Sequence, residues 1–442
     1  MSAHRLPRPG SLQVPAGAWL AAGLVLACSA APSGLPAASS PLVTPGPSTA
    51  VASPTIGSAA SVDPWAADLD ELDRGVRRLH VSPFTIHSDA DWNARLAEIR
   101  PKLANASPDE QFVLVASLVG LLDSHSGVAP KEGLHAYELL FYKFSDGWFV
   151  VAAKDESLVG SRLISIGGHP VEEVEATIRP LVPHDSESGF LYNAESLFSN
   201  VEYLHGTRIV SDQAKPQYVL EQPDGTSLTV DPRVVDERRW AEELRILGAL
   251  VGDAPTAVAR RGERIWTSID GAHRVFLISV NDYGDMQAAG EAMTSALDAR
   301  QVDRVVLDAR YLQGGNGDIA ILETLRDDPR VNRPGGLTAL IGRENVSAGT
   351  QVAYYLDTQT DALLVGEATP ARANNFTCPC QDITLPHSGF IVSVPTYWDV
   401  RADPRPEIAP DLPMALSSAD FFAGHDPVLD AALAGLAPAP SP

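Results

Sequence analysis

The sequence predicts an α/β protein whose core is a largely parallel sheet, preceded by a helical segment and a β-rich module. After Arg274, short apolar runs such as RVFLISV, DRVVLDAR and GLTALIG alternate with helix-like stretches such as MQAAGEAMTSALDA. This alternation is typical of βαβ units in a parallel sheet. Upstream of Arg274 the hydrophobic period is first that of helices and then that of strands. A chain of 442 residues is also too long for one core, so several domains are expected.

The first residues have the pattern of an export signal. His4, Arg5 and Arg8 precede the apolar run AGAWLAAGLVLA, which ends in small residues at Cys28 and is too short to span a bilayer as a stable helix. VLAC, at 25–28, resembles the lipobox of bacterial lipoproteins, in which the cysteine becomes the lipidated N-terminus. We therefore expect lipidation at Cys28, the alternative being a secretory signal that is cleaved nearby.

The composition of the next segment and the net charge of the chain limit the possible partners. From Cys28 to about residue 62 the chain is mostly Ala, Pro, Ser, Thr and Gly, which cannot bury enough apolar area to fold and predicts a disordered tether. The formal net charge is -23, with no basic patch to offset it. A nucleic-acid partner is therefore not expected, because such binding relies on Lys and Arg.

The body of the chain then shows three successive patterns. WNARLAEIRPKL and DEQFVLVASLVGLL have helical spacing, and the SPD before the second is a plausible capping start. GWFVVAA, SRLISIGG and PQYVLEQPDGTSLTV have strand character, and the DG pair in the last predicts a hairpin. RRWAEELRILGALV predicts a linker helix before the α/β core. The expected divisions are an export signal at 1–27, a tether at 28–62, a helical segment at 63–132, a β-rich module with its linker helix at 133–265, and the α/β core at 266–442.

Sites in parallel sheets gather in loops at the carboxyl ends of strands. Three loops qualify, those after DRVVLDAR, GLTALIG and DALLVGE, and Ser347 lies in the second, within GRENVSAGTQVA. Ser347 has two interpretations: an N-cap whose oxygen accepts a backbone N–H, or a nucleophile. Gly314 and Gly315, in the loop after DRVVLDAR, could supply backbone donors for an oxyanion or could simply form a turn.

Six motifs taken together resemble the tail-specific, or C-terminal-processing, serine protease family. They are, in order, VVLDARYLQGG, ENVSAG, LVGEAT, ITLPHSGFIVSVP, IAPDLPM and GHDPVLDAAL, and LLDSHSGV resembles the upstream motif of that family. The resemblance implies an α/β core of crotonase/ClpP-like type (βαβ repeats, largely parallel sheet), a PDZ-like module and peptide substrates. It implies that Ser347 is the nucleophile, and that the N–H groups of Ala348 and Gly315 form the oxyanion hole.

Some residues depart from this family pattern. Arg372 falls where many members have a lysine base, and a guanidinium does not deprotonate in proteins. Leu312 and Phe376 replace an asparagine and a glutamine that those enzymes often carry. The chain therefore resembles more closely the members without the catalytic lysine, such as the tricorn protease core, which uses a histidine preceded by a serine. Ser124 and His125 match that pair.

A histidine near its reference pKa suits general-base work near neutral pH, so His125 is the candidate base. The alternative is that His125 only holds its loop together. A carboxylate or hydroxyl should fix the tautomer of the imidazole, and the candidates are Glu367, Glu407 and Ser124. Asp308 and Arg310 are expected to form an ion pair or loop anchor.

The two remaining cysteines, Cys378 and Cys380, receive no function from the sequence. One intervening residue would make a strained disulfide ring, and two thiols alone make an incomplete metal site. We therefore expect no metal and no cofactor.

These observations predict an extracytoplasmic serine endopeptidase, a hydrolase of peptide bonds. It would be a membrane-anchored lipoprotein on the outer face of the bacterial cytoplasmic membrane, or otherwise a secreted protein. The expected partners are a peptide or protein substrate and the membrane, through the N-terminal lipid anchor. The alternative is a catalytically impaired, lipid-tethered peptide-binding protein on the same scaffold. A non-peptidase relative of the crotonases is a third option, although no thioester-binding features are recognisable.

Overall fold

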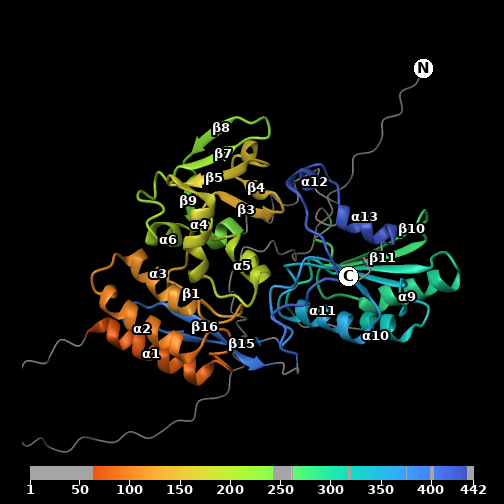
Figure 1. Cartoon of the computed structure of the whole chain (residues 1–442), viewed down its shortest axis with the longest axis horizontal. Helices are drawn as coiled ribbons and strands as arrows, with labels where there is room; N and C mark the ends of the chain where they lie inside the picture. Colours follow the sequence, from red (N-terminus) through yellow and green to blue (C-terminus); the bar gives the residue numbers. More distant parts are fainter. Residues whose placement is uncertain are drawn as a thin grey trace, which may run out of the picture.

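The structure of the protein is a computed structural model that describes residues 63–241, 260, 262–315, 320–374, 376–398 and 403–435. The predicted export signal, Cys28 and the tether at 28–62 lie outside the described residues, as does most of the predicted linker helix. Within the described ranges, no helix has both the length and the apolar character needed to cross a membrane. Two lobes lie side by side, joined by chain segments that pass between them (Figure 1).

The first lobe begins with three helices, as the sequence predicts. They are α1 (Pro64–Leu79), α2 (Asp89–Leu103) and α3 (Pro108–Val119). Asp63 caps α1, and Ser88 and Ser107 form capping boxes that satisfy backbone donors at the starts of α2 and α3. The expected capping start at SPD is therefore confirmed.

The β-rich part of this lobe is an antiparallel sheet of order β3-β4-β5-β7-β8, with β6 beside β5 and a separate β2-β9 pair. The strands are β2 (His135–Tyr137), β3 (Leu139–Phe144), β4 (Gly147–Ala153), β5 (Arg162–Ile166), β6 (His169–Pro170), β7 (Tyr218–Glu221), β8 (Ser227–Val230) and β9 (Val234–Asp236). The helices are η1 (Glu156–Leu158), α4 (Val171–Ile178), η2 (Arg179–Leu181), α5 (Glu187–Ala194) and α6 (Val201–Gly206). The hairpin predicted at DG joins β7 to β8, with Gly225 at φ 83°.

The second lobe is an α/β core around one sheet of order β10-β11-β12-β13-β14-β17. The strands are β10 (Ile265–Asp270), β11 (Val275–Val280), β12 (Arg304–Asp308), β13 (Leu337–Ile341), β14 (Leu363–Gly366) and β17 (Leu412–Pro413). Only the β10-β11 pair is antiparallel, so the predicted, mostly parallel sheet is confirmed. Every residue of β11 and β13 is buried, as expected for strands covered on both faces.

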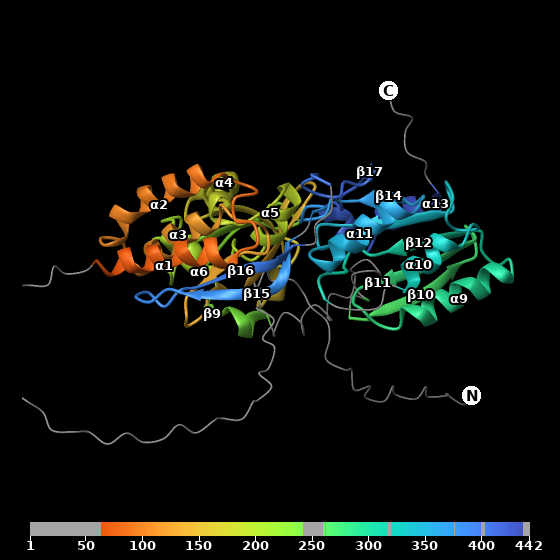
Figure 2. The same cartoon turned by 90° about the horizontal axis from the view of Figure 1, so that it is seen from below.

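Helices cover both faces of this sheet (Figure 2). They are α9 (Met286–Asp298), α10 (Ala320–Asp327), α11 (Ala348–Gln359) and α13 (Pro427–Ala434), whereas α12 (Ser418–Phe422) contacts the first lobe, where Phe421 and Phe422 lie against Phe144 of β3. Side chains of α9, α10 and α11 share one apolar cluster with the sheet, and α13 packs on the opposite face. The carboxyl ends of β12, β13 and β14 meet at one edge, which places their loops together.

A C-terminal hairpin returns to the first lobe, which differs from the continuous core expected at 266–442. β15 (Phe376–Thr384) and β16 (Ile391–Trp398) form a three-stranded sheet with β1 (Gly127–Ala129), in the order β1-β16-β15. This sheet packs against α1, and Ile383 and Val392 belong to the apolar cluster of the helical segment. Hydrophobic period identifies strands but not their distant partners, which is why the sequence did not predict this exchange.

The structure also differs from the sequence-based expectation for the two cysteines. Cys378 and Cys380 are joined in a disulfide at the start of β15. The described ranges contain no group of three or more His, Cys, Asp or Glu side chains suited to a metal ion.

Candidate active site

Ser347 lies between β13 and α11, at the carboxyl end of the core sheet. It occupies the N-cap position of α11, but its side chain makes no capping hydrogen bond to the helix. Its backbone is at φ 55° and ψ -117°, a conformation that a non-glycine residue rarely adopts without compensation from its surroundings. The structure therefore does not support the interpretation of Ser347 as an ordinary helix cap.

The glycine pair in the loop after β12 lies against Ser347. A Cβ placed on Gly314 would be 3.0 Å from the Cβ and 3.4 Å from the Oγ of Ser347. Gly315 has φ 146°, which favours glycine, and Ala348 is the first residue of α11, where backbone N–H groups lack partners within the helix. The residues proposed from the sequence for the nucleophile and the oxyanion hole are thus brought to one place.

Asn345, which the sequence analysis did not single out, holds these two loops together. Its side-chain amide donates to the carbonyl oxygens of Ala309 (2.6 Å) and Leu312 (3.0 Å), and its oxygen accepts the N–H of Gly342 at 2.8 Å. Asn345 is 1% exposed. The side chain of Leu312 packs in the core, so the loop is anchored through its carbonyl group rather than its side chain.

A second link joins the same loops. The Gln313 side-chain amide donates to Glu344 Oε2 at 3.1 Å, and the carbonyl of Leu312 would be 2.1 Å from a Cβ on Gly349. A side chain at Gly349 would therefore push the two loops apart. The polar pair Glu344-Asn345, separated by two residues from the end of an apolar strand, was the signal in the sequence that could have identified these contacts.

Arg310 anchors the loop after β12 from the other side, as the sequence predicts. Its guanidinium binds the carboxylates of Asp308 and Asp426, with Nη2 at 2.7 Å from an oxygen of each. All three side chains are buried. The two carboxylates raise the pKa of Arg310 even though burial lowers it, so the guanidinium remains charged.

Ser124 and His125 lie in the loop between α3 and β1, and Asp123 fixes this loop. Asp123 Oδ1 accepts the N–H of His125 at 2.9 Å, and Oδ2 contacts the hydroxyl of Ser126 at 3.1 Å and His80 Nε2 at 2.5 Å. His80 Nδ1 accepts the N–H of Ser82, so its Nε2 carries the proton that it donates to Asp123. His80 is a further residue that the sequence analysis missed.

The imidazole of His125 is enclosed. Both ring nitrogens are buried, and neither has a hydrogen-bond partner among the described residues. Burial lowers the pKa of His125, and the nearby carboxylate of Asp123 only partly offsets this. The ring is therefore neutral at neutral pH, which is the state that can accept a proton.

The three groups considered for orienting His125 differ in their contacts. The Ser124 hydroxyl donates to the carbonyl of Pro370 at 3.2 Å and accepts the N–H of Asp185 at 3.0 Å, so it joins loops. Glu367 is bound by Arg343, with Nη2 at 2.9 Å and Nε at 3.2 Å from its two oxygens. These two groups are engaged elsewhere.

Glu407 is half-buried and makes no hydrogen bond or ion pair with any described residue. The next residue, Ile408, makes two hydrogen bonds with Thr369. Its carbonyl accepts the N–H of Thr369 at 3.1 Å, and its N–H donates to the Thr369 hydroxyl at 2.9 Å. Pro370, which accepts from Ser124, follows Thr369 directly. Glu407 therefore lies on the segment beside the loop that contacts Ser124, but it makes no hydrogen bond to His125.

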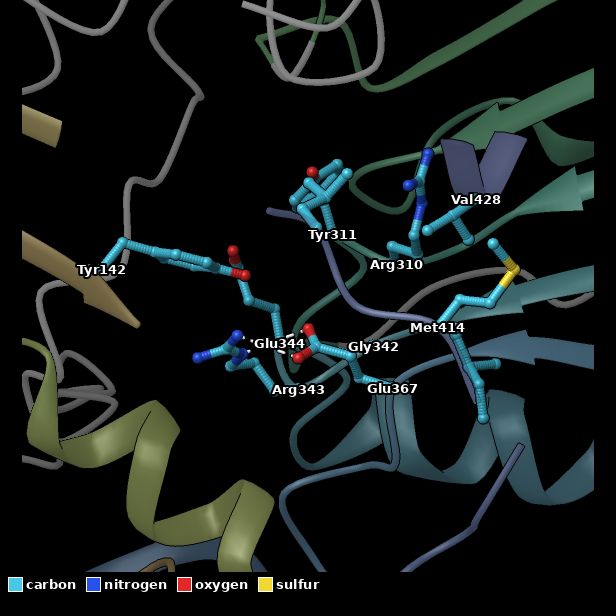
Figure 3. Close-up of a pocket in the computed structure, with 12 residues that line it drawn as sticks. Tyr142, Arg310, Tyr311, Gly342, Arg343, Glu344, Glu367, Met414 and Val428 are labelled. Atoms are coloured by element: carbon cyan, nitrogen blue, oxygen red, sulfur yellow. Dashed lines mark hydrogen bonds and ion pairs between the residues drawn. The ribbon is translucent and has the colours of Figure 1, made fainter. Parts of the chain in front are cut away.

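A small cavity lies between the lobes, beside the loop that leads to Ser347 (Figure 3). Its volume is about 30 Å³, which suits a water molecule and not a peptide side chain. Arg343 lies at its wall, binds Glu367 and donates to the carbonyl of Lys143 at 2.7 Å, while its guanidinium lies 4.3 Å from the ring centre of Tyr142. These contacts join the core to β3 of the first lobe.

Comparison with solved structures agrees with this architecture, whereas comparison of sequences finds no relative. No model of a known protein family matches the sequence, and no curated protein matches it either. The structure resembles that of mature CPAF in complex with lactacystin, with a TM-score of 0.60, 15% identity, and coverage of 84% of this chain and 98% of that chain. It also resembles a serine-to-alanine mutant of CPAF, with a TM-score of 0.58, 16% identity, and coverage of 83% and 95%.

The chain therefore has a two-lobed α/β fold, and this fold resembles that of CPAF. A weaker likeness, to the photosystem II D1 C-terminal processing protease, has a TM-score of 0.37 and 14% identity over 83% of this chain. At these identities the comparisons establish the fold alone.

Proposed function

We propose that this protein is a serine endopeptidase with Ser347 as its nucleophile. One observation carries the proposal: Ser347 starts a helix without capping it, in a strained backbone conformation, and packs against the first glycine of a glycine pair. Acyl transfer needs a positioned hydroxyl beside backbone donors, and the fit of Ser347 against the glycine pair at the start of a helix supports that role. The resemblance of the motifs to tail-specific proteases and the CPAF fold point to the same chemistry.

In the proposed mechanism, Ser347 Oγ attacks the carbonyl carbon of the scissile peptide bond as His125 takes the hydroxyl proton. The N–H groups of Ala348 and Gly315 donate to the resulting oxyanion. His125 then gives its proton to the leaving amine. In the second half of the reaction, His125 takes a proton from the water that attacks the acyl-enzyme and returns it to Ser347 Oγ as the acid product leaves. A neutral, buried imidazole is suited to the first step.

Glu407 is the proposed partner that orients His125. Glu367 is bound by Arg343, and the Ser124 hydroxyl is used between Pro370 and Asp185, whereas Glu407 makes no hydrogen bond or ion pair with a described residue and would have to move onto the unpartnered Nδ1 of His125. A carboxylate on Nδ1 would fix the tautomer in which Nε2 accepts the serine proton. The arginine at position 372 cannot serve as the base.

The second candidate function is a peptide-binding protein without catalysis. It is favoured by the absence of a hydrogen-bond partner on either ring nitrogen of His125 among the described residues. If His125 only filled space in its loop, Ser347 would have no base. The two functions differ in whether Ser347 is activated.

A fluorophosphonate probe tests the choice directly. The proposal predicts stoichiometric labelling of Ser347 in the full chain, located by peptide mapping, and loss of labelling in Ser347→Ala. Ser268→Ala, at an exposed position in β10, is the matched control and should label like the wild type. Labelling that is absent in the wild type, or that persists in Ser347→Ala, would favour the binding-protein function.

We also propose that the protein acts outside the cytoplasmic membrane, anchored by a lipid on Cys28. The basic start, the apolar run and VLAC support this proposal. Mass spectrometry of the membrane fraction should find a lipidated N-terminus at Cys28, and Cys28→Ser should release the protein from that fraction. An unmodified mature N-terminus elsewhere would contradict the anchor.

A further inference from the structure

Asp185 lies where three loops meet behind His125. It precedes Ser186, the N-cap of α5, and its side chain is 1% exposed. Its backbone N–H donates to Ser124 Oγ at 3.0 Å, and its Oδ2 accepts the N–H of Arg372 at 3.3 Å. One residue therefore contacts both the neighbour of His125 and the loop after β14.

The packing around Asp185 leaves little freedom. Ser124 Oγ donates to the carbonyl of Pro370, which completes a ring of contacts through Asp185 and Arg372. A Cβ placed on Gly189, in the first turn of α5, would be 2.4 Å from that carbonyl and 3.3 Å from Ser124 Oγ. Helix α5 thus presses on both loops, and a shift of either loop would disturb the other.

The carboxylate of Asp185 is only partly compensated by the groups around it. Its Oδ1 is buried with no hydrogen-bond partner in the described part of the chain, and Arg372 Nε lies 4.0 Å from Oδ2. Burial and the carboxylate of Asp123 raise its pKa to about 7, while Arg372 acts in the opposite direction. Asp123 is in turn held by His80 and by the backbone of His125. Asp185 therefore changes its charge near neutral pH within this cluster.

We propose that Asp185 is a positioning residue for His125, which clamps the Ser124-His125 loop to the loop after β14 through Ser124 and Arg372. When ionised, its carboxylate attracts the Arg372 guanidinium and holds the loop that carries Pro370. When protonated, it loses that attraction, and the clamp loosens. Arg372 then has a role in this chain that does not require it to lose a proton. This inference rests on the proposed peptidase function for its kinetic consequences, but not for its structural ones.

The kinetic test is Asp185→Asn, which keeps the shape and removes the charge. At pH 8.5 we expect kcat to fall about 10-fold with KM nearly unchanged, because Asp185 acts through loop position and not through substrate. At pH 5.5, where the wild-type carboxyl is protonated, the two proteins should differ by less than about twofold. Glu187→Gln, an exposed change at the start of the helix that follows Asp185, is the control and should match the wild type at both pH values.

A double-mutant cycle tests the route through Arg372. Arg372→Met should lower kcat at pH 8.5 about as much as Asp185→Asn, and the double variant should be no worse than either one. A loss in Asp185→Asn that is equal at both pH values, or additive losses in the cycle, would overturn the clamp.

Hydrogen–deuterium exchange by mass spectrometry gives a readout that does not need activity. In Asp185→Ala, peptides covering 123–126 and 369–374 should exchange faster together, while Glu187→Gln leaves them unchanged. If the wild type neither hydrolyses peptides nor labels with the probe, the proposed function fails, and this exchange measurement decides the clamp by itself. Unchanged exchange in both peptides would reject the clamp in an active or an inactive protein.

Discussion

Gly314 touches Ser347: a Cβ on the glycine would stand 3.0 Å from the Cβ of the serine, closer than side chains normally approach. The loop after β12 and the loop after β13 are therefore fitted to each other at the point where the proposed reaction occurs. Gly314 has an ordinary backbone conformation, so its role is to leave space and not to permit a positive φ. Alanine at position 314 would therefore add a steric contact with Ser347 without straining the backbone.

Gly314→Ala should lower kcat/KM and the rate of fluorophosphonate labelling by about 10-fold or more, because the added methyl group displaces Ser347 from its position. Gly271→Ala is the matched control, since nothing lies within 4 Å of a Cβ at that position. The two variants should unfold at nearly the same temperature. Equal labelling rates in both would show that the contact with Gly314 does not position Ser347.

His80→Ala should destabilise the first lobe. It removes the hydrogen-bond donor of a buried carboxylate, and loss of a hydrogen bond to a buried charged group costs roughly 1.5–3 kcal/mol. Thermal unfolding should show a clear drop in the midpoint, whereas His87→Ala, at an exposed position nearby, should leave the midpoint unchanged. A midpoint in His80→Ala equal to that of the wild type would mean that Asp123 does not depend on His80.

Glu237 predicts a dependence of stability on pH. Burial, and then the charge of Glu202, raise its pKa to about 7 in the folded state. The folded chain therefore holds this proton to higher pH than the unfolded chain, and the free energy of unfolding should fall as pH rises from about 4.5 to about 7.

Glu237→Gln should remove that loss. We expect the variant to melt a few degrees above the wild type at pH 8 and at nearly the same temperature at pH 4.5. Glu156→Gln, at an exposed position in η1, should show no such difference. A variant less stable than the wild type at pH 8 would contradict the raised pKa of Glu237.

The parallel core was predictable because its strands are local apolar runs, such as the fully buried β11 and β13. The place of Ser347 at the carboxyl edge of the sheet was predictable because strand-end loops in parallel sheets converge there. These features depend on sequence neighbours. They need no knowledge of distant partners.

The rest of the site depends on contacts that are remote in sequence. His80 meets Asp123 across 43 positions, and Ser124 meets Pro370 across 246. Asp185 lies in a loop of the β-rich part with no motif around it, so only folding brings it to Arg372. The return of β15 and β16 to the first lobe is of the same kind, because strand period does not reveal which sheet a strand joins.

The central claim, that His125 removes the proton from Ser347, is tested most directly by kcat/KM of His125→Ala, Ser347→Ala and the double variant on one peptide substrate. We expect each single variant to lose about 10³-fold or more and the double variant to lose no more than either, because members of a catalytic unit are strongly non-additive. The wild-type rate should fall on the acidic side with a pKa below the ordinary histidine value, because burial lowers the pKa of His125. His87→Ala is the control. Full activity in His125→Ala, with the fold intact, would contradict the claim.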